Sequence, residues 1–266
     1  MKKYILSILL SGAFMFTACS DFLDEVPKGN ITSEGYYKTA QHAISATNAI
    51  YDYLIIGYAP NGLWDKNYGG TFYNDYWVLQ DMFADNSETN QTSIDYQSVE
   101  NMQIDQYNQP VELLWRDFYQ TIKCCNVVID KVPSIDMDVT LRNQLVAEAK
   151  FFRAMMYFDL IRMFGDVPLR EHNVESAEED ATSRTSKETI YELIFSDLKT
   201  AETDLKYTER FGGGRPYPAS ASALLARVYL TYAAEHHSQE HYQLAVDKAK
   251  SCLLYTSPSP RDMRRS

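Results

Sequence analysis

Apolar residues recur every three or four positions along most of the chain, and this spacing predicts helices. The pattern is clearest in six stretches, at residues 41–55, 111–131, 141–164, 190–205, 219–234 and 242–250. A capping-box pattern, Thr185-Ser186-Lys187-Glu188, predicts a helix start just before the fourth stretch. Because no segment alternates apolar and polar residues strongly enough to indicate a strand, the pattern predicts an all-α fold.

The stretch from Leu141 to Pro168 is the one around which we expect the other helices to pack. Its apolar residues fall on two stripes, which include Leu145, Phe152 and Leu160 on one and Phe151, Phe158 and Phe164 on the other. A helix that is apolar on two sides is usually buried, with neighbours on both. Gly165 can adopt a left-handed conformation after the last turn, and Pro168 prevents continuation.

The region from residue 51 to residue 119 combines many aromatic rings with Asn, Asp and Gln. Its rings include Trp64, Tyr68, Phe72, Tyr73, Tyr76, Trp77, Tyr96 and Tyr107. Residues 57–70 contain four Gly, one Pro and several Asn and Asp, which predicts a loop, and we expect loops or short helices in much of the rest. Rings beside amide and carboxylate groups suit sugars, which stack an apolar face and hydrogen-bond through hydroxyls. The alternative is that these rings pack loops onto the core.

The formal net charge of the 266-residue chain is −11. This acidity argues against a nucleic acid as partner, because a phosphate backbone is bound by Lys and Arg. Residues 255–266 are Pro-broken and basic in an otherwise acidic chain. We interpret them as a foreign or disordered tail, and the foreign alternative implies that the protein is truncated.

The chain begins with a targeting segment. Lys2 and Lys3 precede an apolar run at residues 4–16 that is too short for a stable membrane span. The small residues before Cys19 resemble the lipobox of a bacterial lipoprotein, so we expect removal of residues 1–18 and a lipid anchor at Cys19. Acidic residues follow, as in some lipoproteins sent to the cell surface. The alternative is an ordinary secretory signal.

No set of residues predicts catalysis, a cofactor or a metal site. The cysteines at 124, 125 and 252 have neither disulfide nor metal-ligand spacing, and we interpret them as packing residues. His237 and His241 would share one face of a continuous helix, but their motif is not a His-Glu-x-x-His pair, and we interpret them as surface residues. There is no serine elbow and no distinctive carboxylate pair, so we do not expect an enzyme.

Several segments in order resemble the SusD/RagB family of outer-membrane nutrient-binding lipoproteins. They comprise Cys19-Ser20-Asp21-Phe22-Leu23-Asp24 with Pro27; Trp115, Tyr119, Ile122 and Asn126; Glu148-Ala149-Lys150-Phe151-Phe152-Arg153-Ala154; Phe164-Gly165-Asp166-Val167-Pro168; and Gly214-Arg215 with Ala226-Arg227-Val228-Tyr229-Leu230. The match runs to about Leu254, so residues 19–254 resemble the N-terminal part of a SusD-like domain. The last two helices also resemble a tetratricopeptide unit.

The resemblance implies a helical scaffold of tetratricopeptide-like pairs with long, irregular, aromatic-rich loops. It implies a surface-exposed lipoprotein that captures an oligosaccharide, or sometimes a peptide, and delivers it to a TonB-dependent barrel of the SusC type. Family members are roughly twice as long, and their second half contributes much of the ligand site. Within the signature, we expect Arg153 and Asp166 to hold the helix and its turn in place rather than to touch ligand.

Candidate ligand-binding residues lie in the aromatic-rich region. They are the carboxylates and amide of Asp81, Asp85 and Asn86, where the family often has an acidic residue, and the rings of Trp77, Tyr96 and Tyr107, which we expect in loops. Two other functions remain open: a surface-anchored glycoside hydrolase of helical fold, and a helical-repeat scaffold that binds only proteins.

Overall fold

A computed structural model describes residues 36–58, 64–72, 75–90, 92–174, 183–206 and 214–256. The chain divides into two units, residues 1–36 and 37–266. All but the last residue of the first unit lies outside the described residues, as do the predicted signal peptide, Cys19 and residues 257–266 of the predicted tail. The following description concerns the second unit.

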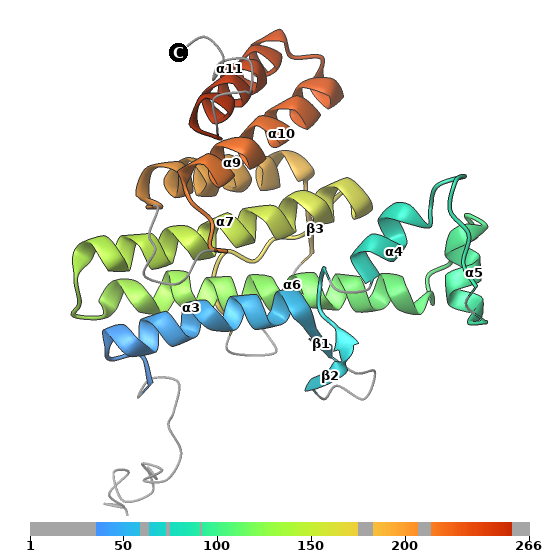
Figure 1. Cartoon of the computed structure of the whole chain (residues 1–266), viewed down its shortest axis with the longest axis horizontal. Helices are drawn as coiled ribbons and strands as arrows, with labels where there is room; N and C mark the ends of the chain where they lie inside the picture. The colour runs from blue at the N-terminus through green and yellow to red at the C-terminus, as the bar shows by residue number, and fades with distance from the viewer. Residues whose placement is uncertain are drawn as a thin grey trace, which may run out of the picture. The chain divides into compact units, whose positions relative to one another are not determined.

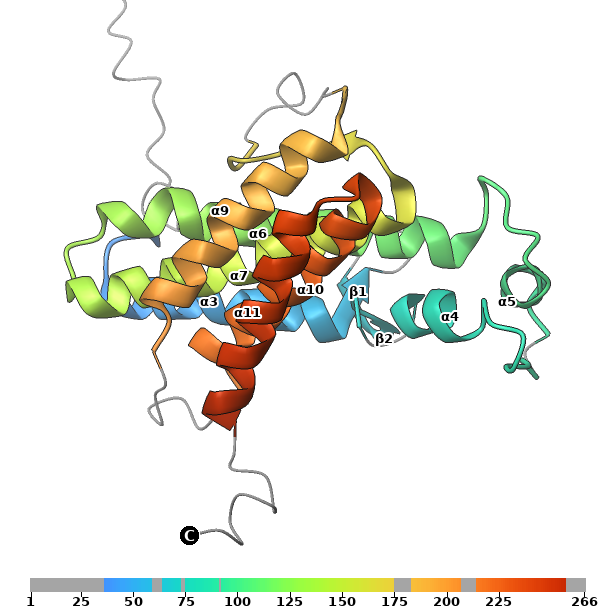
Figure 2. The same ribbon diagram turned by 90° about the horizontal axis from the view of Figure 1, so that it is seen from above.

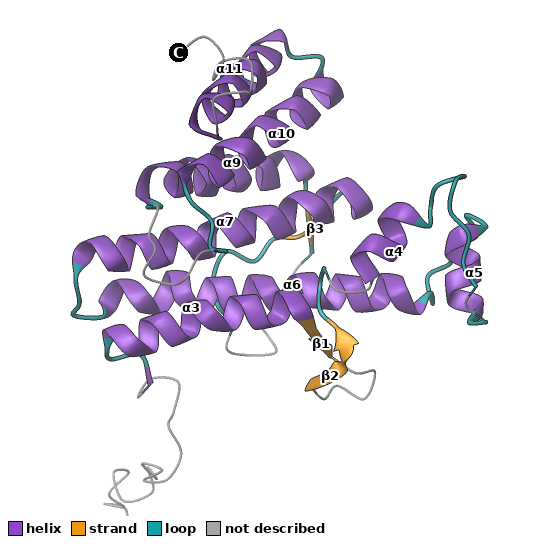
Figure 3. Ribbon diagram, in the orientation of Figure 1, coloured by secondary structure: helices purple, strands orange, loops and turns teal. Residues whose placement is uncertain are grey.

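The described part of the chain is predominantly helical (Figures 1 and 3). Its helices are α3 (Ala40–Ile55), α4 (Asp75–Asp81), α5 (Ile94–Glu100), α6 (Gln109–Lys131), the 3-10 turn η3 (Val132–Ser134), α7 (Val139–Phe164), α9 (Lys187–Asp204), α10 (Pro218–His236) and α11 (Gln239–Thr256). The prediction of an all-α fold is confirmed, and every helix predicted from periodicity is present.

The long helices pack on one another in chain order, from α3 through α6, α7, α9 and α10 to α11 (Figures 1 and 2). Helix α10 and helix α11 form the predicted pair, joined by His237 and Ser238, with His237 in the left-handed conformation at a φ of 51°. Because each helix buries one face on its predecessor and another on its successor, the stack forms one continuous apolar core.

Helix α7 lies at the centre of this stack, between α6 and α9. Its buried side chains occur on all sides of the helix axis, as its two apolar stripes predicted. The Asp138 side chain caps its N-terminus by accepting a hydrogen bond from the Leu141 backbone N–H at 2.8 Å. At its end Gly165 has a φ of 70°, a positive value that favours glycine, as predicted. Its ψ of −127° lies outside the left-handed helical conformation that we expected.

A buried polar cluster joins α7 to its two neighbours. The Arg153 guanidinium donates to both carboxylate oxygens of Asp197 on α9, at 2.7 and 2.9 Å. It also donates to the side-chain oxygen of Asn126 on α6, at 2.9 Å, and to the backbone oxygen of Glu171. Asp166 accepts from the Lys187 backbone N–H at the start of α9. Arg153 and Asp166 therefore hold helix and turn together, as expected.

The predicted loop at residues 57–70 is wrong in part, because it contains an antiparallel hairpin. Strand β1 (Ile56–Tyr58) pairs with β2 (Trp64–Gly69), and the chain then returns onto the end of α3. The backbone N–H groups of Gly70, Thr71 and Phe72 donate to carbonyls of residues 55, 53 and 54, which lie in the last turn of α3. Strands this short carry no readable alternation, so the sequence pattern did not reveal them.

Two smaller differences concern the segment after α7. Strand β3 (Val167–Pro168) pairs with β4 (Arg184–Thr185), which brings the start of α9 back to the end of α7. The N-cap of α9 is Ser186, whose side chain accepts from the Thr189 N–H. The predicted capping box at Thr185 and Glu188 is therefore wrong, because Thr185 belongs to the strand and the N-cap lies one residue later.

The cysteines at 124, 125 and 252 are all free, which agrees with a packing role. Cys125 is fully buried in the core. Among the helices of the described ranges, none is both long enough and apolar enough to cross a bilayer.

Candidate functional site

Helices α4 and α5, the two shortest α-helices in the described ranges, form a module with its own small apolar cluster at the N-terminal end of α6 (Figures 1 and 2). The cluster consists of Val78 and Met82 from the α4 region and Val99 from α5, with Leu79, Tyr96 and Ile104 packed around it. Helices of seven residues are not stable in isolation. Their positions must therefore come from this cluster and from contacts with α6.

Asn108 fastens the module to α6. Its side-chain NH₂ donates to the Asp95 backbone oxygen at 2.9 Å and to the Ser98 hydroxyl at 2.8 Å, both on α5. Its side-chain oxygen accepts from the Val111 N–H and so caps α6. One nearly buried amide thus sets where α5 lies relative to the first turn of α6.

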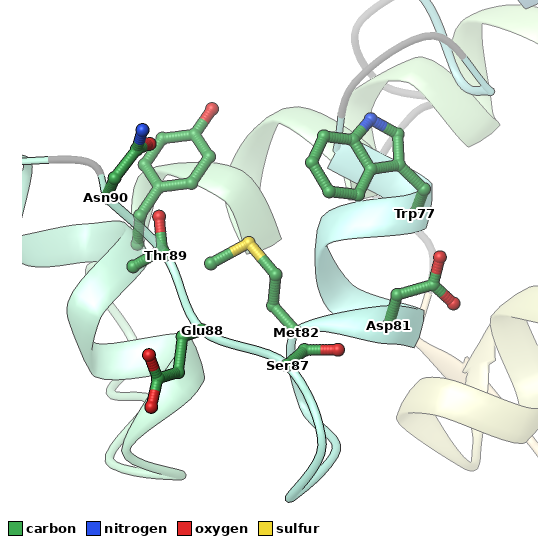
Figure 4. Close-up of a pocket in the computed structure, with 8 residues that line it drawn as sticks. Trp77, Asp81, Met82, Ser87, Glu88, Thr89 and Asn90 are labelled. Atoms are coloured by element: carbon green, nitrogen blue, oxygen red, sulfur yellow. The ribbon is translucent and has the colours of Figure 1, made fainter.

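A second contact positions the extended segment between α4 and α5. The Glu100 carboxylate, at the end of α5, accepts from the Thr89 backbone N–H at 3.3 Å. This contact holds residues 87–90 across from α4, and the gap between them is a pocket. Figure 4 shows Ser87, Glu88, Thr89 and Asn90 on this segment at one side of the pocket and Trp77 and Asp81 on α4 at the other, with Met82 between the two sides.

The pocket has a volume of about 760 Å³, within the range of small-molecule sites. It is lined by Trp77, Asp81, Met82, Ser87, Glu88, Thr89, Asn90 and Tyr96. Trp77 and Asp81 are four residues apart on α4, so they share a helix face. Trp77 is 46% exposed, which is high for a residue of this size.

The pocket combines apolar and polar groups in the manner of a sugar site. Trp77, Tyr96 and Met82 offer apolar surface, on which a pyranose can lay its C–H face. The hydroxyls of Ser87 and Thr89, the Asn90 amide and the carboxylates of Asp81 and Glu88 can pair with sugar hydroxyls. All of the lining groups come from residues 77–96, so the module alone builds the site.

The structure brings together three of the six ligand-binding residues proposed from sequence: Trp77, Asp81 and Tyr96. Asp85 and Asn86 are exposed in the turn after α4, outside the lining. Tyr107 is 78% exposed between α5 and α6, also outside it. The expectation that all three rings lie in loops is wrong for Trp77 and Tyr96, which are on α4 and α5.

Sequence reasoning missed the other five lining residues. Ser87, Glu88, Thr89 and Asn90 form an uninterrupted polar run, which is a signal for an exposed segment but not for a particular partner. Nothing in the sequence marked Met82 as a lining residue, because its position in the pocket depends on how α4 and α5 pack on each other. Of the other rings in this region, Phe72 and Tyr76 pack against the main core, as the alternative interpretation held.

No group of three or more His, Cys, Asp or Glu suited to a metal ion occurs among the described residues. His237 lies in the turn between α10 and α11, so it does not share a helix face with His241. The His241 ring lies 2.8 Å from the Ser238 hydroxyl, and the His236 ring stacks on Tyr232 with centroids 4.0 Å apart. His236 and His241 therefore belong to the packing between α9, α10 and α11.

Comparison with known proteins places these features in one family. A family model described as "Starch-binding associating with outer membrane" matches residues 21–230. A SusD-like protein of Formosa agariphila, named P2, is 31% identical over 259 residues, which cover 97% of this chain and 49% of that protein. The chain thus spans about half the length of this relative.

Solved structures show the same fold. A SusD superfamily protein from Bacteroides vulgatus superimposes with a TM-score of 0.69 at 22% identity, over 84% of this chain and 45% of that one. A structure titled "Laminarin binding SusD-like protein" is 26% identical, with a TM-score of 0.63 over 80% of this chain and 43% of its own. Since the family model covers most of the chain and the helical stack has the same architecture, this protein belongs to the SusD-like family, which is described as associated with the outer membrane.

Proposed function

We propose that this protein captures oligosaccharide at the cell surface and passes it to a TonB-dependent, SusC-like barrel in the outer membrane. The observation that carries the proposal is the pocket between α4 and α5, in which an exposed Trp77 and a partly buried Tyr96 accompany hydroxyl, amide and carboxylate groups. Family membership and the laminarin-binding relative support a glycan as ligand.

The chemistry of the pocket predicts weak binding by this site alone. One aromatic stacking contact contributes about 0.5–1.5 kcal/mol beyond its buried area, whereas a dissociation constant of about 1 mM requires about 4 kcal/mol. Stacking on both rings together with several hydrogen bonds therefore reaches about millimolar affinity. The second half present in longer relatives would add contacts that raise it.

The test is to compare the intact chain with variants of the pocket rings. We expect Trp77→Ala to weaken binding of laminarin oligosaccharides about tenfold, because it removes the stacking surface, and Tyr96→Ala to weaken it severalfold. Ligand-observed NMR is suited to affinities in this range. Tyr107→Ala is the matched control, since it removes an exposed ring of the same region that does not line the pocket. Equal losses in all three variants would contradict the placement of the site.

Membrane attachment through a lipid on Cys19 is part of the proposal. We expect Cys19→Ala to move the protein from the membrane fraction to the soluble fraction, because acylation requires that thiol. Retention in the membrane fraction would exclude a lipid anchor at this residue. Co-purification of the unmodified protein with an outer-membrane barrel tests the transporter as partner.

We further propose that the protein binds without turning over its ligand. Incubation of the full chain with oligosaccharide, followed by measurement of new reducing ends, distinguishes binding from hydrolysis. A glycosidase that used Asp81 and Glu88 as its two catalytic carboxylates would produce new reducing ends. The Asp81→Asn variant would then lose this activity. Association with a barrel and no affinity for any glycan would favour a protein-binding scaffold.

A further inference from the structure

Negative charge in this protein is concentrated in the region that carries the pocket. Residues 67–115 contain eight Asp or Glu and no Lys, Arg or His, whereas the whole chain has a formal net charge of −11. This region includes α4, α5 and the segment between them. The segment around the pocket therefore contributes eight formal negative charges and no positive one, which favours cationic over anionic ligands.

Two of these acidic residues, Asp81 and Glu88, belong to the lining of the pocket, and none of the described lining residues is Lys, Arg or His. Both residues are exposed, and neither has a hydrogen-bond or ion-pair partner among the residues that the structure describes. Two other carboxylates of this region accept hydrogen bonds within the chain: Glu100 from the Thr89 N–H and Asp105 from the Tyr107 N–H. The two free carboxylates are thus available to a ligand.

Resting on the proposed function, we propose that this pocket selects glycans by charge. It accepts sugars that carry protonated amino groups most readily, accepts neutral sugars, and excludes sugars that carry carboxylate or sulfate groups. An ammonium group beside Asp81 or Glu88 gains an ion pair, and one that faces the exposed Trp77 ring also gains a cation–π contact. A neutral sugar can donate its hydroxyls to the same carboxylates.

An anionic sugar has no compensating partner in the pocket. Its carboxylate or sulfate would lie near two like charges and beside the apolar surface of Trp77 and Met82, where water screens less well. Such groups are usually bound by Arg or Lys, which the lining lacks. The lining residues of the pocket and the acidic residues around it thus both favour cationic sugars over anionic ones.

The experiment uses three tetrasaccharides with the same backbone: one of glucose, one of glucosamine, and one of glucose oxidised to the uronic acid. Binding to the full chain is measured by ligand-observed NMR at mildly acidic pH, where the amine is protonated. At low salt we expect the glucosamine ligand to bind about tenfold more tightly than the uronic acid ligand, with the glucose ligand between them. Near 1 M salt we expect less than about a twofold difference.

Charge-neutral variants assign the selection to the pocket. Asp81→Asn and Glu88→Gln should each reduce the preference for glucosamine over uronic acid by about threefold. Asp85→Asn, which removes an exposed carboxylate of the same region outside the lining, should reduce it by less than about 1.5-fold. Because all three side chains are exposed, the variants should keep the unfolding temperature of the parent protein, which circular dichroism can check.

The outcomes separate this inference from the function on which it rests. If the glucose and uronic acid ligands bind equally at low salt, charge selection is wrong while glycan capture stands. If Asp85→Asn acts as strongly as the two pocket variants, the pocket does not make the selection. If no ligand of the three binds, glycan capture by this chain is wrong and the inference falls with it.

Discussion

At the scale of single residues, the best-supported assignment is that of Arg153 as a structural cation. Its side chain is buried, and its partner Asp197 is almost completely buried on the neighbouring helix. The guanidinium donates two hydrogen bonds to that carboxylate and one each to Asn126 and the Glu171 backbone. A buried charge is tolerated only when it is paired and hydrogen-bonded in this way.

Replacing Asp197 by Asn should therefore destabilise the fold strongly. The change leaves the Arg153 charge buried without a counter-charge, for which we expect a loss of about 3–5 kcal/mol in the free energy of unfolding. Urea unfolding followed by circular dichroism measures it. Glu192→Gln removes one negative charge from an exposed position of the same helix and should change the free energy by less than about 0.5 kcal/mol. Similar effects of the two substitutions would show that the pair contributes little.

At the scale of elements, the α4–α5 module differs from the helical stack in how it is held. The long helices share one extensive core, whereas the module has a cluster of three buried side chains and is tied to α6 through Asn108. A segment with few buried contacts opens locally at a lower free energy than the rest of the protein. Because this segment builds the pocket, its local stability should affect ligand affinity.

Asn108→Ala tests this coupling. The substitution removes the cap of α6 and two hydrogen bonds to α5, and we expect it to cost about 1–2 kcal/mol. Hydrogen exchange should become faster at the amides of residues 94–100 and stay unchanged in α9, α10 and α11. Asn86→Ala, at an exposed position of the same module, is the control and should leave exchange in α5 unaltered. Uniformly faster exchange would mean that the module is not a separate unit.

At the scale of the whole molecule, many of the hydroxyl and thiol groups on the long helices are buried in the stack. Burial raises the pKa of Cys124 from an ordinary value of 9.0 to about 11. It also raises the pKa values of Tyr119 and Tyr157, whose hydroxyls donate to the backbone oxygens of Pro168 and Arg170. These groups keep their protons in the folded protein at pH values where the unfolded chain releases them.

The protein should consequently lose stability in alkaline solution. Above about pH 9 the unfolded state binds fewer protons than the folded state, so the free energy of unfolding falls as pH rises. Melting temperatures measured from pH 7 to pH 11 should be level at first and should decline from about pH 9, more steeply above pH 10. Cys124→Ala should make the decline near pH 9 shallower without removing it, because burial also raises the pKa of Cys125 well above 9.0. Tyr107→Phe, at an exposed ring, should leave the curve unchanged. A level curve to pH 11 would contradict this expectation.

The sequence by itself determined the six long helices, α3, α6, α7, α9, α10 and α11, because each of them carries its own periodicity over nine or more residues. It did not determine α4 and α5, which are only seven residues long. It also determined the central place of α7, since a helix that is apolar on two sides has to be covered on both. The role of Gly165 followed from local chemistry as well. Features set by a few neighbouring residues, such as the short hairpin after α3 and the N-cap of α9, were missed or displaced by one position.

Only the tertiary structure decided which polar and aromatic residues share the pocket. Trp77, Asp81 and Tyr96 meet there because α4 and α5 pack on a common cluster. Asp85, Asn86 and Tyr107 are residues of similar polar and aromatic types, yet they lie outside the lining. The contacts responsible, from Glu100 to Thr89 and from Asn108 to α5, join residues that are about ten positions apart. Such contacts leave no periodic pattern, because they depend on the path of the chain between two short helices and not on the residues of either one.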